Sequence, residues 1–118
     1  MNNTVQRGKW GEQVALDYLQ GKGFQKVFEN FHSRFGEIDL IVKNHEYLVF
    51  VEVKLRKNPN FAHAREAVDY HKQKKLRSAA NLWLSARETE LQPRFDVIEI
   101  YSEDRATEPK IVHIENAF

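Results

Sequence analysis

The stretch from Gly36 to Arg56, GEIDLIVKNHEYLVFVEVKLR, constrains the fold more than any other part of this chain. Two runs of aliphatic and aromatic residues predict two β-strands, and the polar residues between them predict the turn of a hairpin. Charged side chains interrupt both runs, Asp39 in the first and Glu52 and Lys54 in the second. Burying a lone charge in such a run costs several kcal/mol unless the charge is paired or binds a metal. These three residues are therefore the first candidates for a functional site.

Strand geometry gathers the charges on one face of the predicted hairpin. Side chains alternate between faces along a strand, and a four-residue loop, Asn44–Tyr47, places Asp39 directly opposite Glu52. The same register places Glu37 opposite Lys54, with the Cβ atoms of facing residues about 5 Å apart. A two-residue loop would shift this register but keep the same faces.

Two facing carboxylates repel each other unless a cation lies between them or one of them is protonated. Mg²⁺ is commonly held by one or two carboxylates, with waters and a substrate phosphate completing its octahedron. Lys54 points the same way as Glu52 and is placed to contact such a water or phosphate. The alternative is an ion-paired sheet face, in which Lys54 only neutralises Glu52 or Glu37.

The composition excludes several kinds of site. The chain contains no cysteine, so it has neither disulfides nor thiolate metal sites, and any metal must be held by carboxylates, histidines or carbonyls. Such donors favour Mg²⁺ or Mn²⁺ over structural zinc. The five histidines follow no metal-binding spacing, and no glycine-rich phosphate-binding or dinucleotide-binding motif occurs.

Length and hydropathy indicate the class of protein. A chain of 118 residues is enough for one domain, and we expect residues 1–118 to form it. No apolar run approaches the ~20 residues of a membrane span, and the N-terminus lacks the apolar stretch of a signal peptide. We therefore expect a cytoplasmic protein without a membrane partner.

Charge is distributed unevenly, although the net charge is only +1. Residues 54–77 contain eight lysines and arginines against two acids, whereas residues 88–118 contain three basic and eight acidic residues. A basic segment beside the hairpin favours a polyanionic partner such as a nucleic acid. The alternative is the solvated face of a helix.

Hydrophobic periodicity and breaker residues divide the chain into helices and strands. The predicted elements are a helix at Thr4–Gly21, strands at Phe24–Ser33, Glu37–Lys43 and Leu48–Leu55, a long helix at Arg65–Ala86, a strand at Arg94–Tyr101 and a short strand at Lys110–Ile114. Pro93 is expected to separate the long helix from the strand that follows. This α-β-β-β-α-β order predicts an α/β fold with a central mixed sheet flanked by helices.

Each predicted helix places a charged residue on or beside its inward face. Glu12 lies on or beside the buried stripe of the first helix, so it would bring a third carboxylate to the site, directly or through water. The alternative is an exposed helix acid. Lys72 lies midway between Val68 and Leu76 at intervals of four residues, which places it on the inward face of the long helix. There it either extends its charged end to solvent or reaches a phosphate near the hairpin.

Basic and polar residues around the hairpin are candidates for phosphate contacts. Arg56 continues the face of Glu52 and Lys54, and its guanidinium suits a bidentate phosphate clamp. Asp96 is instead expected to form an ion pair with Arg94 or Arg56. The candidate nucleic-acid-binding residues are Arg56, Lys57, Lys72, Gln73 and Lys75.

Five segments together resemble a known family. They are Gly11-Glu12, GEIDLI at 36–41, FVEVKLR at 50–56, Lys72-Gln73 and RFDVI at 94–98. They resemble the YraN-like family of endonuclease-like bacterial proteins, within the restriction-endonuclease-like PD-(D/E)xK nuclease superfamily, over nearly the whole chain. The arrangement is also similar to that of archaeal Holliday-junction resolvases. One departure is that Ile38 stands before Asp39, where the motif has a proline.

The resemblance implies a restriction-endonuclease-like fold and a DNA endonuclease that depends on Mg²⁺ or Mn²⁺ and acts on branched or single-stranded DNA. It implies Asp39, Glu52 and the Val53 carbonyl as metal ligands. Glu12 would be an auxiliary catalytic ligand, and Lys54 would steer the attacking water. A homodimer follows by analogy with the resolvases. The alternative is a nucleic-acid-binding or scaffold protein on the same fold, with a weak or inactive site.

Overall fold

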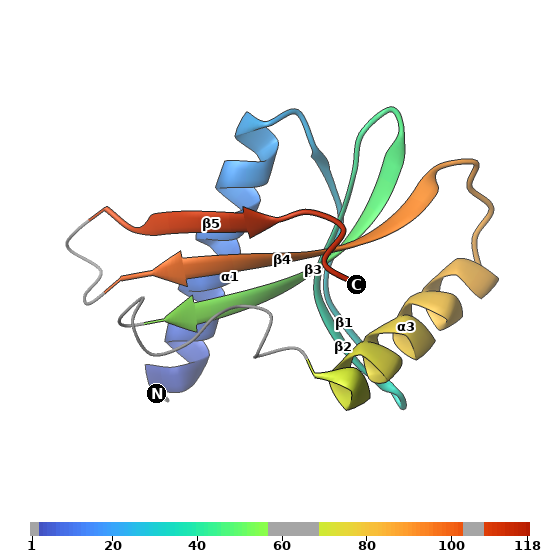
Figure 1. Cartoon of the computed structure of the whole chain (residues 1–118), viewed down its shortest axis with the longest axis horizontal. Helices are drawn as coiled ribbons and strands as arrows, with labels where there is room; N and C mark the ends of the chain where they lie inside the picture. Colours follow the sequence, from blue (N-terminus) through green and yellow to red (C-terminus); the bar gives the residue numbers. More distant parts are fainter. Residues whose placement is uncertain (1–2, 57–68, 103–107) are drawn as a thin grey trace.

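The computed structural model describes residues 3–56, 69–102 and 108–118, and shows an α/β arrangement (Figure 1). The elements in chain order are α1 (Asn3–Gly21), β1 (Gln25–Ser33), β2 (Gly36–Lys43), β3 (Tyr47–Arg56), α3 (Tyr70–Ser85), β4 (Gln92–Tyr101) and β5 (Lys110–Ile114). The predicted α-β-β-β-α-β order is therefore confirmed, and the short fifth strand has the predicted bounds.

The strands form one mixed sheet in the order β1-β2-β3-β4-β5. β3 and β4 are parallel, and the other neighbouring pairs are antiparallel. Parallel neighbours need a crossover connection, and α3 lies in the segment that makes it. In Figure 1, α1 runs behind β3, β4 and β5, whereas α3 lies on the other side of the sheet. The predicted mixed sheet flanked by helices is confirmed.

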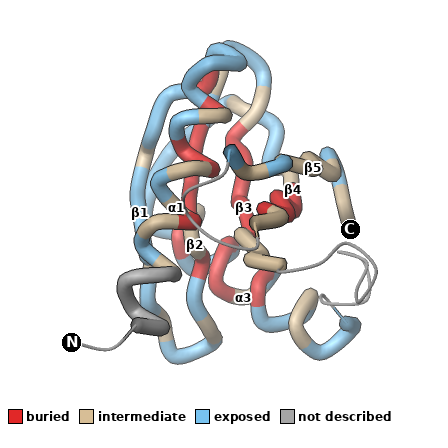
Figure 2. Tube along the Cα trace, turned by 90° about the vertical axis from the view of Figure 1, so that its left-hand side faces the viewer, coloured by how far each residue is buried: buried red, intermediate tan, exposed pale blue. Residues whose placement is uncertain are grey.

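Each helix seals its own hydrophobic core against the sheet. The core under α3 consists of Ile38, Ile41, Leu48, Phe50, Leu76, Ala79, Ala80, Trp83 and Val97. The core under α1 consists of Ala15, Leu16, Leu19, Phe24, Leu40, Val42, Val49, Val51, Ile98 and Ile100. Central strands covered on both faces must be apolar on both faces, which explains the continuous apolar runs of β2 and β3. Figure 2 shows the buried residues concentrated in these strands and on the inner sides of the helices.

The β2–β3 hairpin has the register that the sequence predicted, although β3 begins at Tyr47 and leaves only residues 44–46 between the strands. The side-chain oxygen of Asn44 accepts hydrogen bonds from the backbone N–H groups of Glu46 and Tyr47, at 2.9 and 2.7 Å. The first strand pair is Lys43 with Leu48, and the ladder runs from there to Leu40 and Val51. This register is the one that places Asp39 across from Glu52.

Two predicted boundaries were wrong by more than one residue. The long helix begins at Tyr70 rather than Arg65, because Asp69 has extended backbone and caps α3 by accepting a hydrogen bond from the N–H of Lys72 at 2.9 Å. Residues 65–68 lie outside the described part of the chain. β4 begins at Gln92 and so includes Pro93. Within the described residues β5 pairs with β4 only from Val97 onward, so the missing N–H of proline falls where β4 is an edge.

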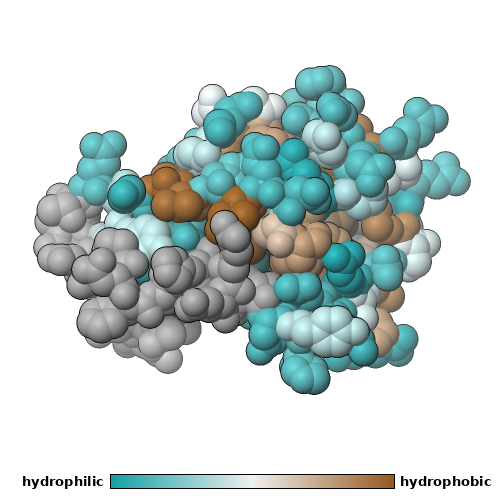
Figure 3. Space-filling view, viewed as in Figure 1, coloured by the Kyte–Doolittle hydropathy of each residue, from teal (hydrophilic) through white to brown (hydrophobic). Residues whose placement is uncertain are grey.

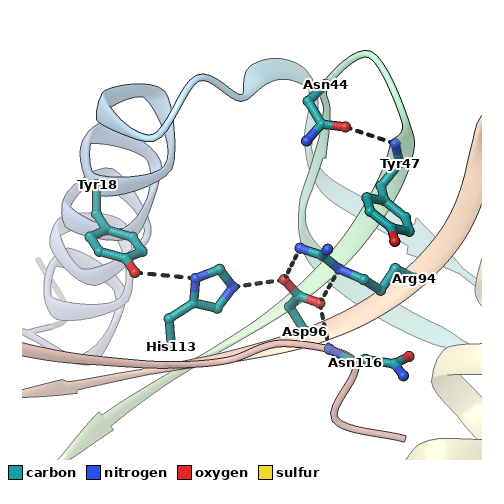
Figure 4. Close-up of polar contacts among 7 residues, drawn as sticks. All are labelled: Tyr18, Asn44, Tyr47, Arg94, Asp96, His113 and Asn116. Carbon is teal, nitrogen blue, oxygen red and sulfur yellow. Dashed lines mark hydrogen bonds and ion pairs between the residues drawn. The ribbon is translucent and has the colours of Figure 1, made fainter.

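A buried polar network joins β4 to α1 and to the C-terminal residues (Figure 4). The guanidinium of Arg94 donates two hydrogen bonds of 2.9 Å to the carboxylate of Asp96, which is 1% exposed. The same carboxylate lies 2.7 Å from Nε2 of His113 and accepts a 3.0 Å hydrogen bond from the backbone N–H of Asn116. Nδ1 of His113 lies 3.2 Å from the hydroxyl of Tyr18 on α1. The expected ion pair of Asp96 is therefore with Arg94.

Within the described residues, no helix combines the length and the apolar character that crossing a bilayer requires.

Replacing Asp96 tests how much this network stabilises the fold. Burial alone would raise the pKa of Asp96, but hydrogen bonds from His113 and Arg94 outweigh it and the pKa is lowered. The carboxylate therefore stabilises the protein above pH 3.8 and loses this effect as pH falls further. We expect Asp96→Asn to reduce the free energy of unfolding at pH 7 by about 3 kcal/mol, because the guanidinium of Arg94, whose side chain is only 11% exposed, loses its counter-charge. Urea denaturation, with exposed Glu90→Gln as the control, measures this; equal stabilities would contradict it.

Candidate functional site

The ladder between β2 and β3 ends just before Asp39. β3 pairs with β4 over its whole length, from Tyr47 to Arg56, whereas its ladder with β2 stops at Leu40 and Val51. Beyond that point a side chain of β2 takes the place of its backbone. The Oδ2 atom of Asp39 accepts a 2.8 Å hydrogen bond from the backbone N–H of Val53. The Asp39 carboxylate is thus held at the place where the two strands part.

Glu52 is nearly buried and is held by two lysines. Its side chain is 6% exposed, and its Oε1 atom lies 3.1 Å from the ammonium of Lys54 and 2.9 Å from that of Lys72. Lys54 comes from the same strand, and Lys72 comes from α3. Burial lowers the pKa of Lys72, but the hydrogen bond and attraction of Glu52 outweigh this, and the pKa is raised. Of the two partners that the sequence left open for Lys54, the structure shows Glu52; Glu37 instead lies 3.0 Å from Nδ1 of His32.

Asp39 has an unusually high affinity for a proton. Burial and then repulsion from Glu52 raise the pKa of Asp39 to about 7, although the Val53 N–H opposes the shift. Repulsion from Glu12 adds to the increase, and Lys72 lessens it. Among the described residues, no positively charged group contacts the Asp39 carboxylate, whereas two lysines contact Glu52. We refer to Asp39, Glu52, Lys54 and Lys72 as the hairpin site.

Glu12 approaches this site from the opposite face of the sheet. With its amide nitrogen turned toward α1, Asn30 of β1 donates to both carboxylate oxygens of Glu12, at 2.7 and 2.9 Å. Burial raises the pKa of Glu12, and the hydrogen bond from Asn30 lowers it. Repulsion from nearby acids, which include Glu52, raises it further, so the pKa of Glu12 is raised on balance. A methyl group at Gly11 would lie 2.7 Å from Cδ2 of Leu55, so the glycine lets α1 lie close to β3. Glu12 is half-buried, as its place beside the buried stripe predicted.

The donors of the hairpin site suit a hard cation. Carboxylate and carbonyl oxygens are the ligands of Mg²⁺ and Mn²⁺. Asp39 supplies an under-neutralised carboxylate beside Glu52, so an added positive charge would be favourable there. In the part of the chain that the structure describes, no three histidine or acidic side chains gather closely enough to hold a metal by themselves. The residues therefore fit a cation that keeps waters and takes one or two carboxylates, rather than one enclosed by three.

The expected phosphate contacts are distributed unevenly around the site. Lys72 reaches Glu52, as described above, while Lys75 is exposed on α3 and its Cβ packs beside Gly36. Gln73 is half-buried. Lys57 lies outside the described residues.

Arg56 does not extend freely from the face of Lys54. Its Nε lies 3.9 Å from Oε2 of Glu99 on β4, its side chain is 22% exposed, and no described residue accepts a hydrogen bond from that buried nitrogen. Tyr101 donates a 2.6 Å hydrogen bond to the same Glu99 oxygen. A phosphate contact by Arg56 would therefore compete with Glu99.

A separate hollow lies away from these residues. It has a volume of about 340 Å³ and is bounded by α3, the start of β4 and the C-terminal residues, among them Arg77, Phe95 and Phe118. None of the residues predicted to act on a metal or a nucleic acid lines it.

Comparison with known proteins identifies the family. The model of the uncharacterised protein family UPF0102 matches residues 11–100, which include Glu12, the whole β2–β3 hairpin and α3. The chain belongs to the UPF0102 family. It is 44% identical to a UPF0102 protein of Caldanaerobacter subterraneus subsp. tengcongensis over 94% of this chain and 93% of that one. It is 42% identical to a relative from Thermodesulfovibrio yellowstonii, over 97% and 96% of the two chains, and 40% identical to one from Clostridioides difficile, over 98% and 99%. The YraN-like resemblance is thereby confirmed.

The sequence did not reveal Asn30 as part of the arrangement. It lies in a strand between Glu29 and Phe31, without a motif or periodicity that singles it out. Only the packing of β1 against α1 brings its amide to Glu12.

The pKa of Asp39 predicts an unusual dependence of stability on pH. Because the pKa of about 7 in the folded protein exceeds the ordinary aspartate pKa of 3.8, the protonated carboxyl stabilises the fold below pH 3.8 and this effect is lost as pH rises through 7. We expect Asp39→Asn, which keeps an acceptor for Val53, to be more stable than wild type at pH 8 by about 2 kcal/mol and similar at low pH, in the presence of EDTA. Thermal or urea unfolding at several pH values measures this.

The matched control is Asp17→Asn on α1, whose carboxylate is exposed and accepts a hydrogen bond from Gln13. It should leave the pH dependence unchanged. An Asp39→Asn protein that is less stable than wild type at pH 8 would contradict the assignment of a repelled, buried carboxylate.

Proposed function

We propose that this protein is a DNA endonuclease that hydrolyses phosphodiester bonds with the help of Mg²⁺ or Mn²⁺. The observation that carries the proposal is the under-neutralised Asp39 carboxylate beside Glu52, held by the Val53 N–H where β2 and β3 part. A half-buried acid kept in such an unfavourable state is typical of a functional site. The family resemblance supports the same chemistry.

Each residue of the hairpin site has a role in this proposal. Asp39, Glu52 and the Val53 carbonyl would hold the cation, and Glu12 would assist as an auxiliary ligand through a water. A bound divalent cation would polarise the scissile phosphate and make a water more acidic. Lys54 keeps donors beyond the one directed at Glu52, and with these it would orient the attacking water and offset negative charge that develops on the phosphate.

The basic segment would hold the nucleic-acid backbone. Lys74 and Lys75 of α3 are exposed, and hydrophilic side chains are frequent at the lower right of Figure 3, where α3 lies. Contacts from lysine and arginine to phosphates are independent of base sequence and sensitive to salt. We therefore propose recognition of DNA shape, with branched or single-stranded DNA as the substrate, by a cytoplasmic protein that acts as a homodimer.

A second candidate function is a nucleic-acid-binding or scaffold protein with an inactive site. The observation that favours it is the pairing of Glu52 with both Lys54 and Lys72, which already neutralises one of the two proposed metal ligands. The two functions differ in their response to a divalent cation, because only the nuclease requires one to bind near Asp39.

Cation binding and cleavage test the proposal together. We expect Mn²⁺ at 100 times its Kd to stabilise wild type by about 2.7 kcal/mol, and to have little effect on Asp39→Asn. Cleavage of branched, flapped, single-stranded or duplex DNA in Mn²⁺ should fall by about 100-fold in Lys54→Met, which loses a donor to the reacting phosphate. Lys43→Met, an exposed lysine at the other end of β2, is the control. A wild type that Mn²⁺ stabilises but that cleaves none of the four DNAs would favour the second function.

The salt dependence of DNA binding tests the role of α3. We expect Lys75→Gln to weaken binding of every DNA by a similar factor and to reduce the slope of log K against log salt by about one, because one phosphate contact is lost. Fluorescence anisotropy at several salt concentrations measures the slope, with Lys43→Gln as the matched control. An unchanged slope would remove Lys75 from the proposed interface.

A further inference from the structure

Asn30 lies beside the hairpin site at a position that its strand register specifies. β1 pairs Glu29 with Leu40 and Phe31 with Ile38, which leaves Asn30 across from Asp39. The register of the hairpin places Asp39 in turn across from Glu52. Asn30, Asp39 and Glu52 therefore follow one another across three adjacent strands.

The backbone of Asn30 is unusual for a residue within a strand. Its φ of +53° lies in the left-handed region, which asparagine tolerates better than most residues and which still costs about 1 kcal/mol. Such a conformation persists only where the surroundings hold it. Here the side chain donates to both carboxylate oxygens of Glu12, 2.7 and 2.9 Å away, and Glu12 belongs to a different element, α1.

We propose that Asn30 is a positioning residue that holds the Glu12 carboxylate in place beside the hairpin site, so that Glu12 can accept a hydrogen bond from a water bound to a divalent cation near Asp39. This inference rests on the proposed function, because it assumes that a cation binds near Asp39. Asn30 itself does not contact the reacting atoms. It acts through Glu12, which it orients while leaving the other lone pairs of both carboxylate oxygens available to a cation or its waters.

A purely structural role for Asn30 makes a different prediction. If asparagine is present only because it tolerates a positive φ, glycine should replace it without loss, since glycine adopts this conformation freely. Asn30→Gly therefore separates the two roles, because it keeps the backbone and removes the amide donor.

A double-mutant cycle tests whether Asn30 acts through Glu12. The variants are Asn30→Gly, Glu12→Ala and the two combined, and the readout is the Kd for Mn²⁺ alone from isothermal titration calorimetry. Partners that orient metal ligands typically affect affinity by about 10–100-fold. We expect Asn30→Gly to weaken Mn²⁺ binding about tenfold when Glu12 is present and by less than about twofold in the Glu12→Ala background.

Stability and cleavage complete the experiment. Unfolding in EDTA should show Asn30→Gly folded; if it does not fold, Asn30→Asp, which tolerates the same backbone and lacks the N–H donor, replaces it in the cycle. An equal loss in both backgrounds, or no loss with Glu12 present, would overturn the inference. A wild type that binds no Mn²⁺ would overturn both the inference and the proposed function. Coupled Mn²⁺ binding without cleavage of any DNA would support the role of Asn30 and overturn only the nuclease.

Discussion

The parting of β2 from β3 after Leu40 and Val51 is the constraint on which the rest of the site depends. β3 continues along β4, so its N–H at Val53 needs an acceptor other than the β2 backbone, and the Asp39 carboxylate supplies it. The same divergence opens the sheet to side chains from both of its faces. Lys72 reaches Glu52 from α3 on one face, while Glu12 approaches from α1 on the other.

The electrostatics of the site follow from how its charges are shared. Two lysines contact one oxygen of Glu52, whereas Asp39 has only a backbone N–H and the distant attraction of Lys72. Burial and repulsion from Glu52 therefore raise the pKa of Asp39. An added positive charge would be favourable beside this carboxylate. The negative charge of Asp39 is therefore unfavourable where it lies, and a bound cation would reduce its electrostatic cost.

The Asp96 network shows the opposite arrangement within the same sheet. Asp96 is more fully buried than Asp39, but Arg94, His113 and the Asn116 N–H satisfy its oxygens and lower its pKa. This network joins β4 to α1 and the C-terminal residues, so a buried acid here stabilises the scaffold. The two aspartates thus differ in their proton affinity because of their partners: Arg94 contacts Asp96, whereas no positively charged group among the described residues contacts Asp39.

The alternation of apolar runs determined the order of elements and the register of the hairpin, because strand periodicity and the Asn44 loop are local properties. It therefore placed Asp39 across from Glu52 without any knowledge of the fold. The start of α3 was mispredicted because Asp69 satisfies helix N–H groups that a periodicity pattern does not detect. Only the tertiary structure decided that Lys54 and Lys72 share Glu52, that Arg56 turns to Glu99 and that Asn30 holds Glu12. These contacts join different elements, and their geometry depends on how the helices pack on a twisted sheet, which residue spacing along one segment does not specify.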